Sequence, residues 1–363
     1  MSDTGVLYAK LSELLECGES CALVSVVEAR GSAPRREGAK MLIDSARQVV
    51  GTVGGGCPEA HARQEALEVI AQGEPKVLEI NMTASGDDPQ AQGLEALICG
   101  GEMKLLVEPL RGGEATSVWR RALERMLGQD QASLLLVVVA CPEGEGTFKV
   151  GDRFSYAPAW GLEGGRELSP QLHEELYNLA QGCWADTQPR QVALESEAGR
   201  VVFFVERLEP APRLYIAGAG HVGRYVALMG QMCGFRVTVN DDRPQFVSRE
   251  LFPQGIELSC LPFNEFFNCL RPKLDRQAYV VLVTRGHQHD EESLRSLMGL
   301  QLGYLGMIGS RRRTAILFRH LREEGADPQW LAQVHAPIGL DIGSETPAEI
   351  AISILAQIIS IRN

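Results

Sequence analysis

Three consecutive glycines run directly into a cysteine within residues 51–59 (GTVGGGCPE), the most unusual stretch of the sequence. Pro58 stands where a helix would begin, and apolar residues recur at helical spacing from there to Gly73. Cys57 would therefore sit at or beside a helix N-terminus, where unpaired N–H groups and the helix dipole favour an anion. That anion is either a ligand phosphate or the thiolate of Cys57 itself. The predicted binding loop consists of Gly54, Gly55, Gly56 and Cys57.

The alternative is a tight turn with an inert cysteine, but three glycines cost chain entropy and add no packing. Nearby, a polar loop carries four cations around a Gly-Ser-Ala-Pro turn: Arg30, Arg35, Arg36 and Lys40. Such a loop suits a phosphorylated or otherwise anionic ligand. Cys99 precedes two further glycines, so Cys57 and Cys99 could bind a soft metal or carry sulfur. The sequence leaves open whether the two cysteines are close together.

A second glycine motif, Gly218-Ala219-Gly220-His221-Val222-Gly223, follows a short apolar run and opens a predicted helix. Asp241 follows a second apolar run, close to the spacing at which an acid meets a ribose hydroxyl. This context predicts a dinucleotide-type fold that binds NAD(P) or another nucleotide, with His221 near a bound phosphate. The alternative is a degenerate Rossmann fold whose site binds nothing.

Two more loops follow apolar strands in the same half. His287, His289 and Asp290 could bind a metal or move protons, although Asp290 could equally cap the next helix. Ser310 is a candidate helix cap followed by Arg311, Arg312 and Arg313, which suit phosphate or carboxylate. Because ligands bind at the carboxyl ends of parallel strands, we expect both loops at the ligand-binding edge.

The order of predicted elements divides the chain at Glu209–Pro212, which has two prolines in three residues. The first part mixes helices with strands, and residues 147–165 read as irregular. After the prolines, strands and helices alternate regularly, which indicates a doubly wound parallel sheet. We therefore expect an α/β protein with a mixed α/β domain at 1–209 and a Rossmann-like domain at 210–363. No internal repeat is recognisable in the sequence.

Composition narrows the class of protein. A net charge of −12 argues against binding to nucleic acid or an anionic membrane surface. The longest apolar run, Leu134–Cys141, is too short to span a bilayer, and residues 1–10 do not resemble a signal peptide. Nine scattered cysteines without a CxxC pair indicate reduced thiols in a cytoplasmic protein.

Taken together, these motifs resemble the XdhC/CoxI family, the accessory factors of xanthine dehydrogenase and related molybdenum hydroxylases. The resemblance extends over nearly the whole chain. It rests on Gly31–Met41, Gly51–Glu59, Cys99–Leu110, Gly218–Gly223, Asp241–Pro244, His287–Asp290, Tyr304–Arg313 and Ala336–Ile358.

The resemblance implies a maturation factor rather than a turnover enzyme. Such proteins bind the molybdenum cofactor, a phosphorylated pterin dithiolene (molybdopterin). They hold it while a cysteine desulfurase supplies the terminal sulfido ligand, and they deliver it to the apo-hydroxylase. Homodimers are also implied. Two alternatives stay open: an NAD(P)-dependent oxidoreductase, and a sulfurtransferase that carries a persulfide on Cys57.

Overall fold

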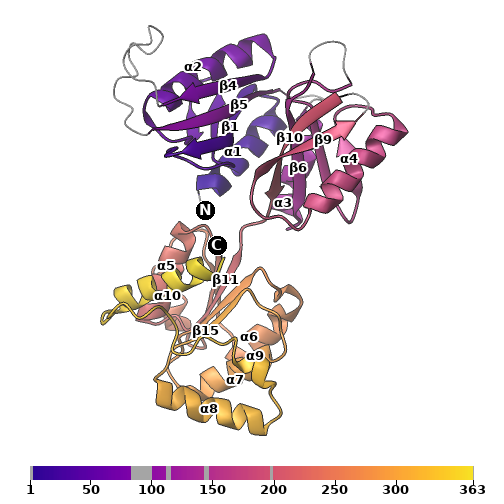
Figure 1. Ribbon diagram of the computed structural model, residues 1–363. Helices are drawn as coiled ribbons and strands as arrows, with labels where there is room; N and C mark the ends of the chain where they lie inside the picture. Colours follow the sequence, from indigo (N-terminus) through magenta and orange to yellow (C-terminus); the bar gives the residue numbers. More distant parts are fainter. Residues whose placement is uncertain (1–2, 83–99, 112–115, 143–146, 197–198, 363) are drawn as a thin grey trace. The chain divides into compact units, whose positions relative to one another are not determined.

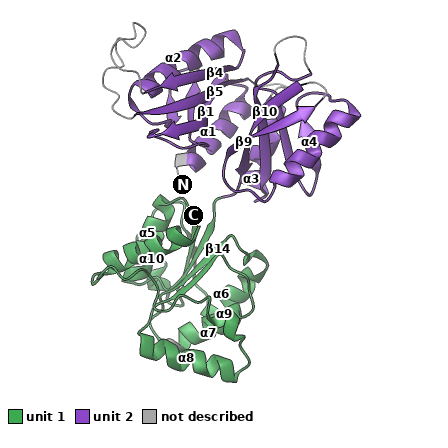
Figure 2. Ribbon diagram, in the orientation of Figure 1, with its two compact units in different colours: residues 1–2, 211–363 green, residues 3–210 purple. Residues whose placement is uncertain are grey.

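The computed structural model describes residues 3–82, 100–111, 116–142, 147–196 and 199–362. The chain divides into two compact units, Asp3–Pro210 and Ala211–Asn363, drawn in purple and green in Figure 2. The division falls within the proline-containing segment Glu209–Pro212. Each unit has its own hydrophobic core.

The Asp3–Pro210 unit contains ten strands in its described residues, arranged in two sheets. Its helices are α1 (Asp3–Cys17), α2 (Gly56–Gln72), α3 (Ser117–Gly128) and α4 (Pro170–Cys183). The strands of one sheet are β1 (Cys21–Gly31), β2 (Lys40–Asp44), β3 (Val49–Gly51), β4 (Lys76–Asn81) and β5 (Gly101–Leu110). Those of the other are β6 (Ser133–Ala140), β7 (Arg153–Ala157), β8 (Gly161–Gly164), β9 (Arg190–Ser196) and β10 (Gly199–Leu208).

Both sheets are antiparallel throughout, in the orders β3-β2-β1-β5-β4 and β8-β7-β6-β10-β9. The central strands are long apolar runs because helices or the other sheet cover both of their faces. Residues 153–157 and 161–164 form β7 and β8, so our expectation of irregular structure there was wrong. Arg153 and Ser155 break the apolar pattern, yet both are buried within the unit.

The Ala211–Asn363 unit is a doubly wound sheet (Figure 1). Its strands are β11 (Arg213–Ala217), β12 (Arg236–Asn240), β13 (Glu257–Ser259), β14 (Ala278–Leu282) and β15 (Tyr304–Met307). Its helices are α5 (His221–Met232), α6 (Phe263–Leu270), α7 (His287–Leu297), α8 (Arg311–Glu323), α9 (Pro328–Leu331) and α10 (Pro347–Arg362), with short 3₁₀ turns η3 (Pro244–Phe246) and η4 (Arg271–Lys273).

The strand order in this unit is β13-β12-β11-β14-β15, and every pairing is parallel. Successive residues of β11 face opposite layers: Leu214 and Ile216 pack with α5 and α10, whereas Tyr215 and Ala217 pack with α6 and α7. The strand order changes direction between β11 and β14. The loops after β11, β12, β14 and β15 therefore gather at one edge, the position at which doubly wound folds bind ligands. The predicted Rossmann-like architecture is confirmed.

Candidate functional site

The structure brings together the basic loop and both glycine elements of the Asp3–Pro210 unit. A Cβ built on Gly54 would lie 2.7 Å from Pro34 Cγ and 3.7 Å from Arg35 Cγ. A Cβ built on Gly101 would lie 2.6 Å from Ala33 N. The segment of residues 30–35 thus passes between the loop before α2 and the start of β5. Only glycine permits such close approach at these positions.

Helix α2 begins at Gly56, two residues earlier than we expected, with Gly55 as its N-cap. Cys57 is therefore the second residue of the helix rather than its cap, and its thiol is partly exposed. Gly55 has φ +75°, and no described heavy atom lies within 4 Å of a Cβ built on it. The first turn of α2 accordingly presents an open backbone surface beside a thiol.

Glu59 holds this loop in shape, a role that the sequence reasoning missed. Its carboxylate accepts hydrogen bonds from the Thr52 hydroxyl, from Gly55 N at 3.1 Å and from Arg63 Nη2 at 2.5 Å. Burial alone would raise the pKa of Glu59, but these hydrogen bonds outweigh it and hold the pKa below its ordinary value. An acidic residue in the first turn, directly after Cys-Pro, was the available signal.

The cations around this loop differ in what they can reach. Arg35 and Arg36 are exposed, whereas Arg30 is paired with Glu28. Lys40 is buried and bonded to Glu206 at 2.8 Å, so it cannot belong to the ligand site as we expected. Cys99 lies outside the described residues. Arg35 and Arg36 are therefore the cations best placed to meet an anion.

The glycine motif of the Ala211–Asn363 unit has the tight geometry that its sequence predicts. A Cβ on Gly218 would lie 2.4 Å from Val283 O, and one on Gly223 would lie 1.8 Å from Gly218 O. Gly220, the N-cap of α5, differs because no described heavy atom lies within 4 Å of its built Cβ. His221 is the exposed first residue of α5. Two glycines thus serve packing, and Gly220 leaves room for a ligand.

Asp241 stabilises this glycine loop through hydrogen bonds. It is buried, and its carboxylate accepts hydrogen bonds from Ala219 N at 2.8 Å and from Arg243 Nε at 2.8 Å. Burial would raise the pKa of Asp241, but the bonds from Arg243 and the Ala219 N–H lower it below the ordinary value. The neighbouring Asp242 is more exposed and pairs with Arg285 at 2.9 Å. Asp242 is therefore the more accessible carboxylate at this edge.

The two histidines stand within helix α7, not in an extended segment as we assumed. The shared face that we expected for these two positions rested on an extended segment, and that premise does not hold here. The His289 ring packs 5.1 Å from that of Phe263, and its Nδ1 lies 3.7 Å from a carboxylate oxygen of Glu292. Asp290 is buried and accepts a hydrogen bond from the Thr284 hydroxyl at 2.6 Å. Asp290 therefore braces the loop after β14.

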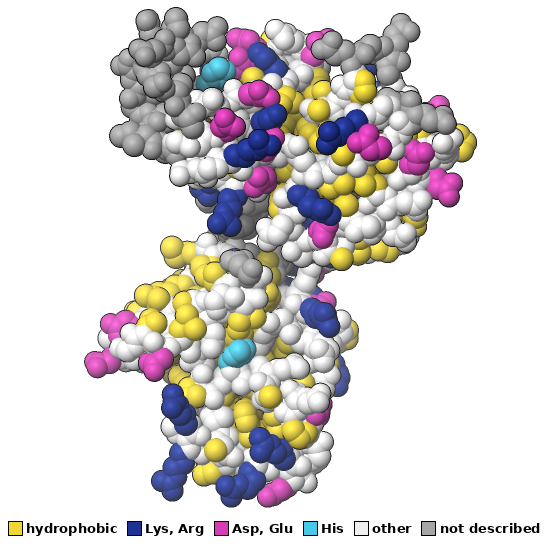
Figure 3. All heavy atoms as spheres, viewed as in Figure 1, with side chains coloured by type: hydrophobic (Ala, Val, Ile, Leu, Met, Phe, Trp, Pro, Cys, Tyr) yellow, Lys and Arg dark blue, Asp and Glu magenta, His cyan; other side chains and the backbone are white. Residues whose placement is uncertain are grey.

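Ser310 is the N-cap of α8, and its hydroxyl oxygen accepts a hydrogen bond from Arg313 N at 3.4 Å. Arg311, Arg312 and Arg313 are all exposed in the first turn. Figure 3 shows Lys and Arg side chains gathered over α8. Cations in a first helical turn oppose the helix dipole, so an anionic ligand would relieve an unfavourable arrangement.

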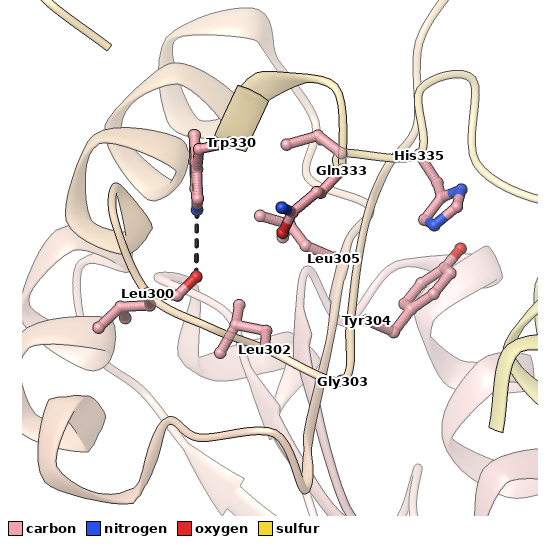
Figure 4. A pocket seen from close by; sticks show the side chains of 9 residues that line it. Leu300, Leu302, Gly303, Tyr304, Leu305, Trp330, Gln333 and His335 are labelled. Carbon is pink, nitrogen blue, oxygen red and sulfur yellow. Dashed lines mark hydrogen bonds between the residues drawn. The ribbon is translucent and has the colours of Figure 1, made fainter. Parts of the chain in front are cut away.

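A cavity of about 250 Å³ lies away from these loops, at the amino end of β15 (Figure 4). Trp330 Nε1 donates to Leu300 O at 3.1 Å, and the rings of Tyr304 and His335 stack with centroids 5.0 Å apart. Burial lowers the pKa of His335, which favours its neutral form. None of the predicted site residues lines this cavity, so we assign it no part in the candidate site.

Neither a metal-binding cluster nor a membrane-spanning helix is found in the described ranges. No group of three or more His, Cys, Asp or Glu side chains is arranged there to hold a metal ion. No helix in the same ranges is long and apolar enough to cross a membrane.

Two family models match the chain. One, described as the XdhC Rossmann domain, matches residues 214–358, and the other, described as the XdhC and CoxI family, matches residues 14–81. The chain belongs to the XdhC and CoxI family. The matched ranges include both glycine loops, with Cys57 in one and Gly220 in the other.

Relatives of the chain are distant but match it along almost its whole length. It is 26% identical to YqeB of Escherichia coli over 358 residues, but spans only 46% of that longer protein. It is 27% identical to a Bacillus subtilis protein described as a probable xanthine dehydrogenase subunit, covering 99% of this chain and 98% of the relative. It is 23% identical to the "molybdenum cofactor insertion chaperone PaoD" of E. coli, and the match covers 96% of this chain and 86% of that relative.

A crystal structure described as a xanthine dehydrogenase from Bacillus halodurans is similar in fold. The TM-score is 0.76 at 24% identity, with 100% of this chain and 96% of that chain covered. At this identity the likeness supports the α/β fold and says nothing of activity.

Proposed function

We propose that this protein binds the molybdenum cofactor and inserts it into an apo molybdenum hydroxylase. The observation that carries the proposal is the open first turn of α2, where Gly55, Gly56 and Cys57 lie beside the loop of exposed Arg35. The relatives named as a cofactor insertion chaperone and as a xanthine dehydrogenase component support the same role.

The residues present fit the chemistry of this cofactor. Molybdopterin carries a phosphate, a hydrogen-bonding pterin and a dithiolene that holds the metal. When bound, the cofactor supplies the molybdenum centre that the acceptor hydroxylase later uses. The glycine loop leaves room that side chains would otherwise occupy, so a bulky ligand can approach the backbone. The exposed guanidinium groups suit the phosphate, and the thiol suits the metal.

Each group of the chain then has a defined task. Arg35 and Arg36 attract the anionic cofactor, while the open backbone at Gly55 lets a bulky ligand approach the helix N-terminus. Glu59 keeps the loop in that shape through Thr52 and the Gly55 N–H. Cys57 offers a sulfur ligand, or carries sulfur, beside the bound cofactor.

The Ala211–Asn363 unit offers a candidate phosphate site of its own, at the carboxyl edge of its sheet. Gly220 leaves its backbone open at the N-terminus of α5, and His221 lies beside it. Ser310 and Arg311 lie at the same sheet edge, since β11 and β15 are parallel. An NAD(P) or other nucleotide ligand is the second candidate for this edge, favoured by the glycine motif and accessible Asp242.

The finer steps of the proposal concern partners. We infer that a cysteine desulfurase supplies sulfur to the bound cofactor and that the chain works as a homodimer. The acceptor is an apo hydroxylase such as xanthine dehydrogenase, and the role belongs in the cytoplasm. An accessory protein of this kind would release its cargo instead of turning over a substrate.

Purification under anaerobic conditions from a molybdenum-replete host tests this proposal. We expect molybdenum and pterin to be recovered with the protein, and the preparation to activate an apo hydroxylase. Absence of both, together with tight NADPH binding and turnover of a carbonyl substrate, would support the oxidoreductase alternative instead.

A further inference from the structure

The two sheets of the Asp3–Pro210 unit repeat one topology. In chain order, α1-β1-β2-β3-α2-β4-β5 is followed by α3-β6-β7-β8-α4-β9-β10, and the two strand orders correspond one to one. Figure 1 shows the two halves, with α2 beside one sheet and α4 beside the other. We call residues 3–110 the first repeat and residues 117–208 the second repeat.

The register of the strands repeats as well. Cys21 at the start of β1 pairs with Leu110, and Ser133 at the start of β6 pairs with Leu208. Both ladders contain an irregularity at the same place, at Val27 in β1 and at Val139 in β6. Such a shared irregularity is a specific feature, because bulges are maintained within related structures.

Backbone hydrogen bonds beside the two irregularities also correspond. Val26 N donates to Ala39 O, and Gly38 N donates to Val26 O. In the second repeat, Val138 N donates to Asp152 O, and Gly151 N donates to Val138 O. Gly38 and Gly151 have the same φ, +86°.

Contacts between the repeats are reciprocal. Lys40 of the first repeat binds Glu206 of the second at 2.8 Å, while Arg153 of the second binds Glu108 of the first at 2.7 Å. Lys40 and Arg153 are both the first residue of their strand, and Glu108 and Glu206 occupy matching positions opposite Leu23 and Leu135. The four charged side chains are buried.

Two glycine–proline contacts between the repeats are reciprocal as well. A Cβ on Gly38 would lie 2.6 Å from Pro189 Cγ, and one on Gly151 would lie 2.6 Å from Pro75 Cγ. Pro75 and Pro189 each directly precede the corresponding strands, β4 and β9. Reciprocal contacts of this kind are what a two-fold interface between identical modules produces.

The loop that leads to the second helix is where the repeats differ. In the first repeat, the N-cap of α2 is Gly55, and Cys57 follows it. In the second, the N-cap of α4 is Ser169, whose hydroxyl accepts a hydrogen bond from Leu172 N at 3.3 Å. The strand before α4 is tied to α3 through Glu163, which binds Arg125 at 2.9 Å. The second repeat thus carries a side chain at its helix N-cap, where the first repeat has a glycine with no described heavy atom within 4 Å of its built Cβ.

We infer that the Asp3–Pro210 unit is an internal duplication of one α-β-β-β-α-β-β module, and that only its first repeat retains a ligand site. The second repeat is a closed copy that braces the first through the reciprocal ion pairs. That the ligand is molybdopterin rests on the proposed function. With one ligand site in the unit, each chain should bind one molybdopterin. The match to the XdhC and CoxI family model, residues 14–81, lies within the first repeat.

The bracing of each repeat by the other is tested without any ligand by changing one ion pair at a time. Lys40→Met and Arg153→Met each leave a buried carboxylate unpaired across the repeats. We expect amide hydrogen exchange to accelerate by roughly a hundredfold or more in the strands of both repeats, and equally for the two variants. Lys40→Met/Glu206→Met, which removes both charges, should restore most of the protection. Acceleration confined to the repeat that carries the change would overturn the inference.

The single ligand site is tested by titration with molybdopterin released from a purified molybdenum hydroxylase. We expect one molecule per chain, loss of binding in Gly55→Val and normal binding in Ser169→Gly. Two molecules per chain, or equal loss in both variants, would contradict the closed second repeat. If the unmodified protein binds no molybdopterin, the proposed function fails, while the hydrogen-exchange result still decides whether the two repeats brace each other.

Discussion

At the scale of single residues, the surroundings of each glycine distinguish those that the fold requires from those at which a ligand could bind. Gly223 packs against the backbone of Gly218, whereas Gly220 faces open space. The same motif therefore contains a structural position and a binding position. Sequence spacing identifies the motif but cannot rank its glycines, since the ranking depends on which backbone atoms come close.

We expect Gly223→Ala to destabilise the Ala211–Asn363 unit by about 3 kcal/mol or more, because its Cβ would overlap Gly218 O. Gly220→Ser should fold normally, since serine is a favoured N-cap and the position has a negative φ of −67°. Its side chain should nevertheless weaken binding of a nucleotide at this unit's sheet edge about tenfold. Chemical denaturation and ligand titration of both variants provide the measurements; unchanged binding in Gly220→Ser would remove this loop from the ligand site.

The arginines of the basic loop make a second residue-level prediction. Replacing Arg35 and Arg36 by alanine should weaken molybdopterin binding and reduce its dependence on salt, because both guanidinium groups are exposed to an anionic ligand. Arg120→Ala, an exposed arginine on α3, is the matched control and should change neither. Titrations at two ionic strengths make the comparison. Equal effects of the two sets of changes would show that only overall charge matters.

At the level of elements, the loop before α2 depends on Glu59 from the helix that follows it. We expect Glu59→Gln to lower the free energy of unfolding by about 1.5–3 kcal/mol at pH 7, the usual range for hydrogen bonds to a charged group. The exposed Glu68→Gln on the same helix should have little effect.

The pH dependence of this effect has a defined sign. The folded-state pKa of Glu59 is lowered, so its stabilising contribution is complete above the unfolded value of about 4.3. It is lost as the pH falls through the lower folded pKa. The stability difference between unmodified protein and Glu59→Gln should therefore shrink in acid. A difference that stays constant from about pH 7 to about pH 2 would contradict the role of the carboxylate.

Elements of the second half were predictable because parallel strands buried on both faces are continuous apolar runs, as in Ala278–Leu282. The first half was harder. Strands β7 and β8 are short, and the burial of Arg153 is explained by its ion pair with Glu108, 45 residues away. Helix α7 was misread at its start because Gly286, not a polar side chain, is its N-cap.

For the whole molecule, the sequence predicted two domains, whereas the duplication that we infer within the first was not recognisable in it. The two repeats share strand order, register and reciprocal ion pairs, yet their side chains have diverged, with lysine in one where arginine stands in the other. Topology is set by which strands pair, and that information is not local in the sequence. The candidate site was only partly predictable: the sequence predicted Cys57 and Gly55 as binding residues, which stays a prediction, it gave no role to Glu59, and Lys40 is buried in an ion pair.

The central claim is that the Cys57 loop binds the molybdenum cofactor. Titration of the anaerobic protein with molybdopterin tests it most directly, comparing unmodified chain with Cys57→Ser and with Cys260→Ser as an exposed cysteine control. We expect Cys57→Ser to weaken binding at least about tenfold, a loss of about 1.4 kcal/mol, with its free energy of unfolding unchanged, and we expect Cys260→Ser to bind normally. Equal affinity of all three proteins would contradict it.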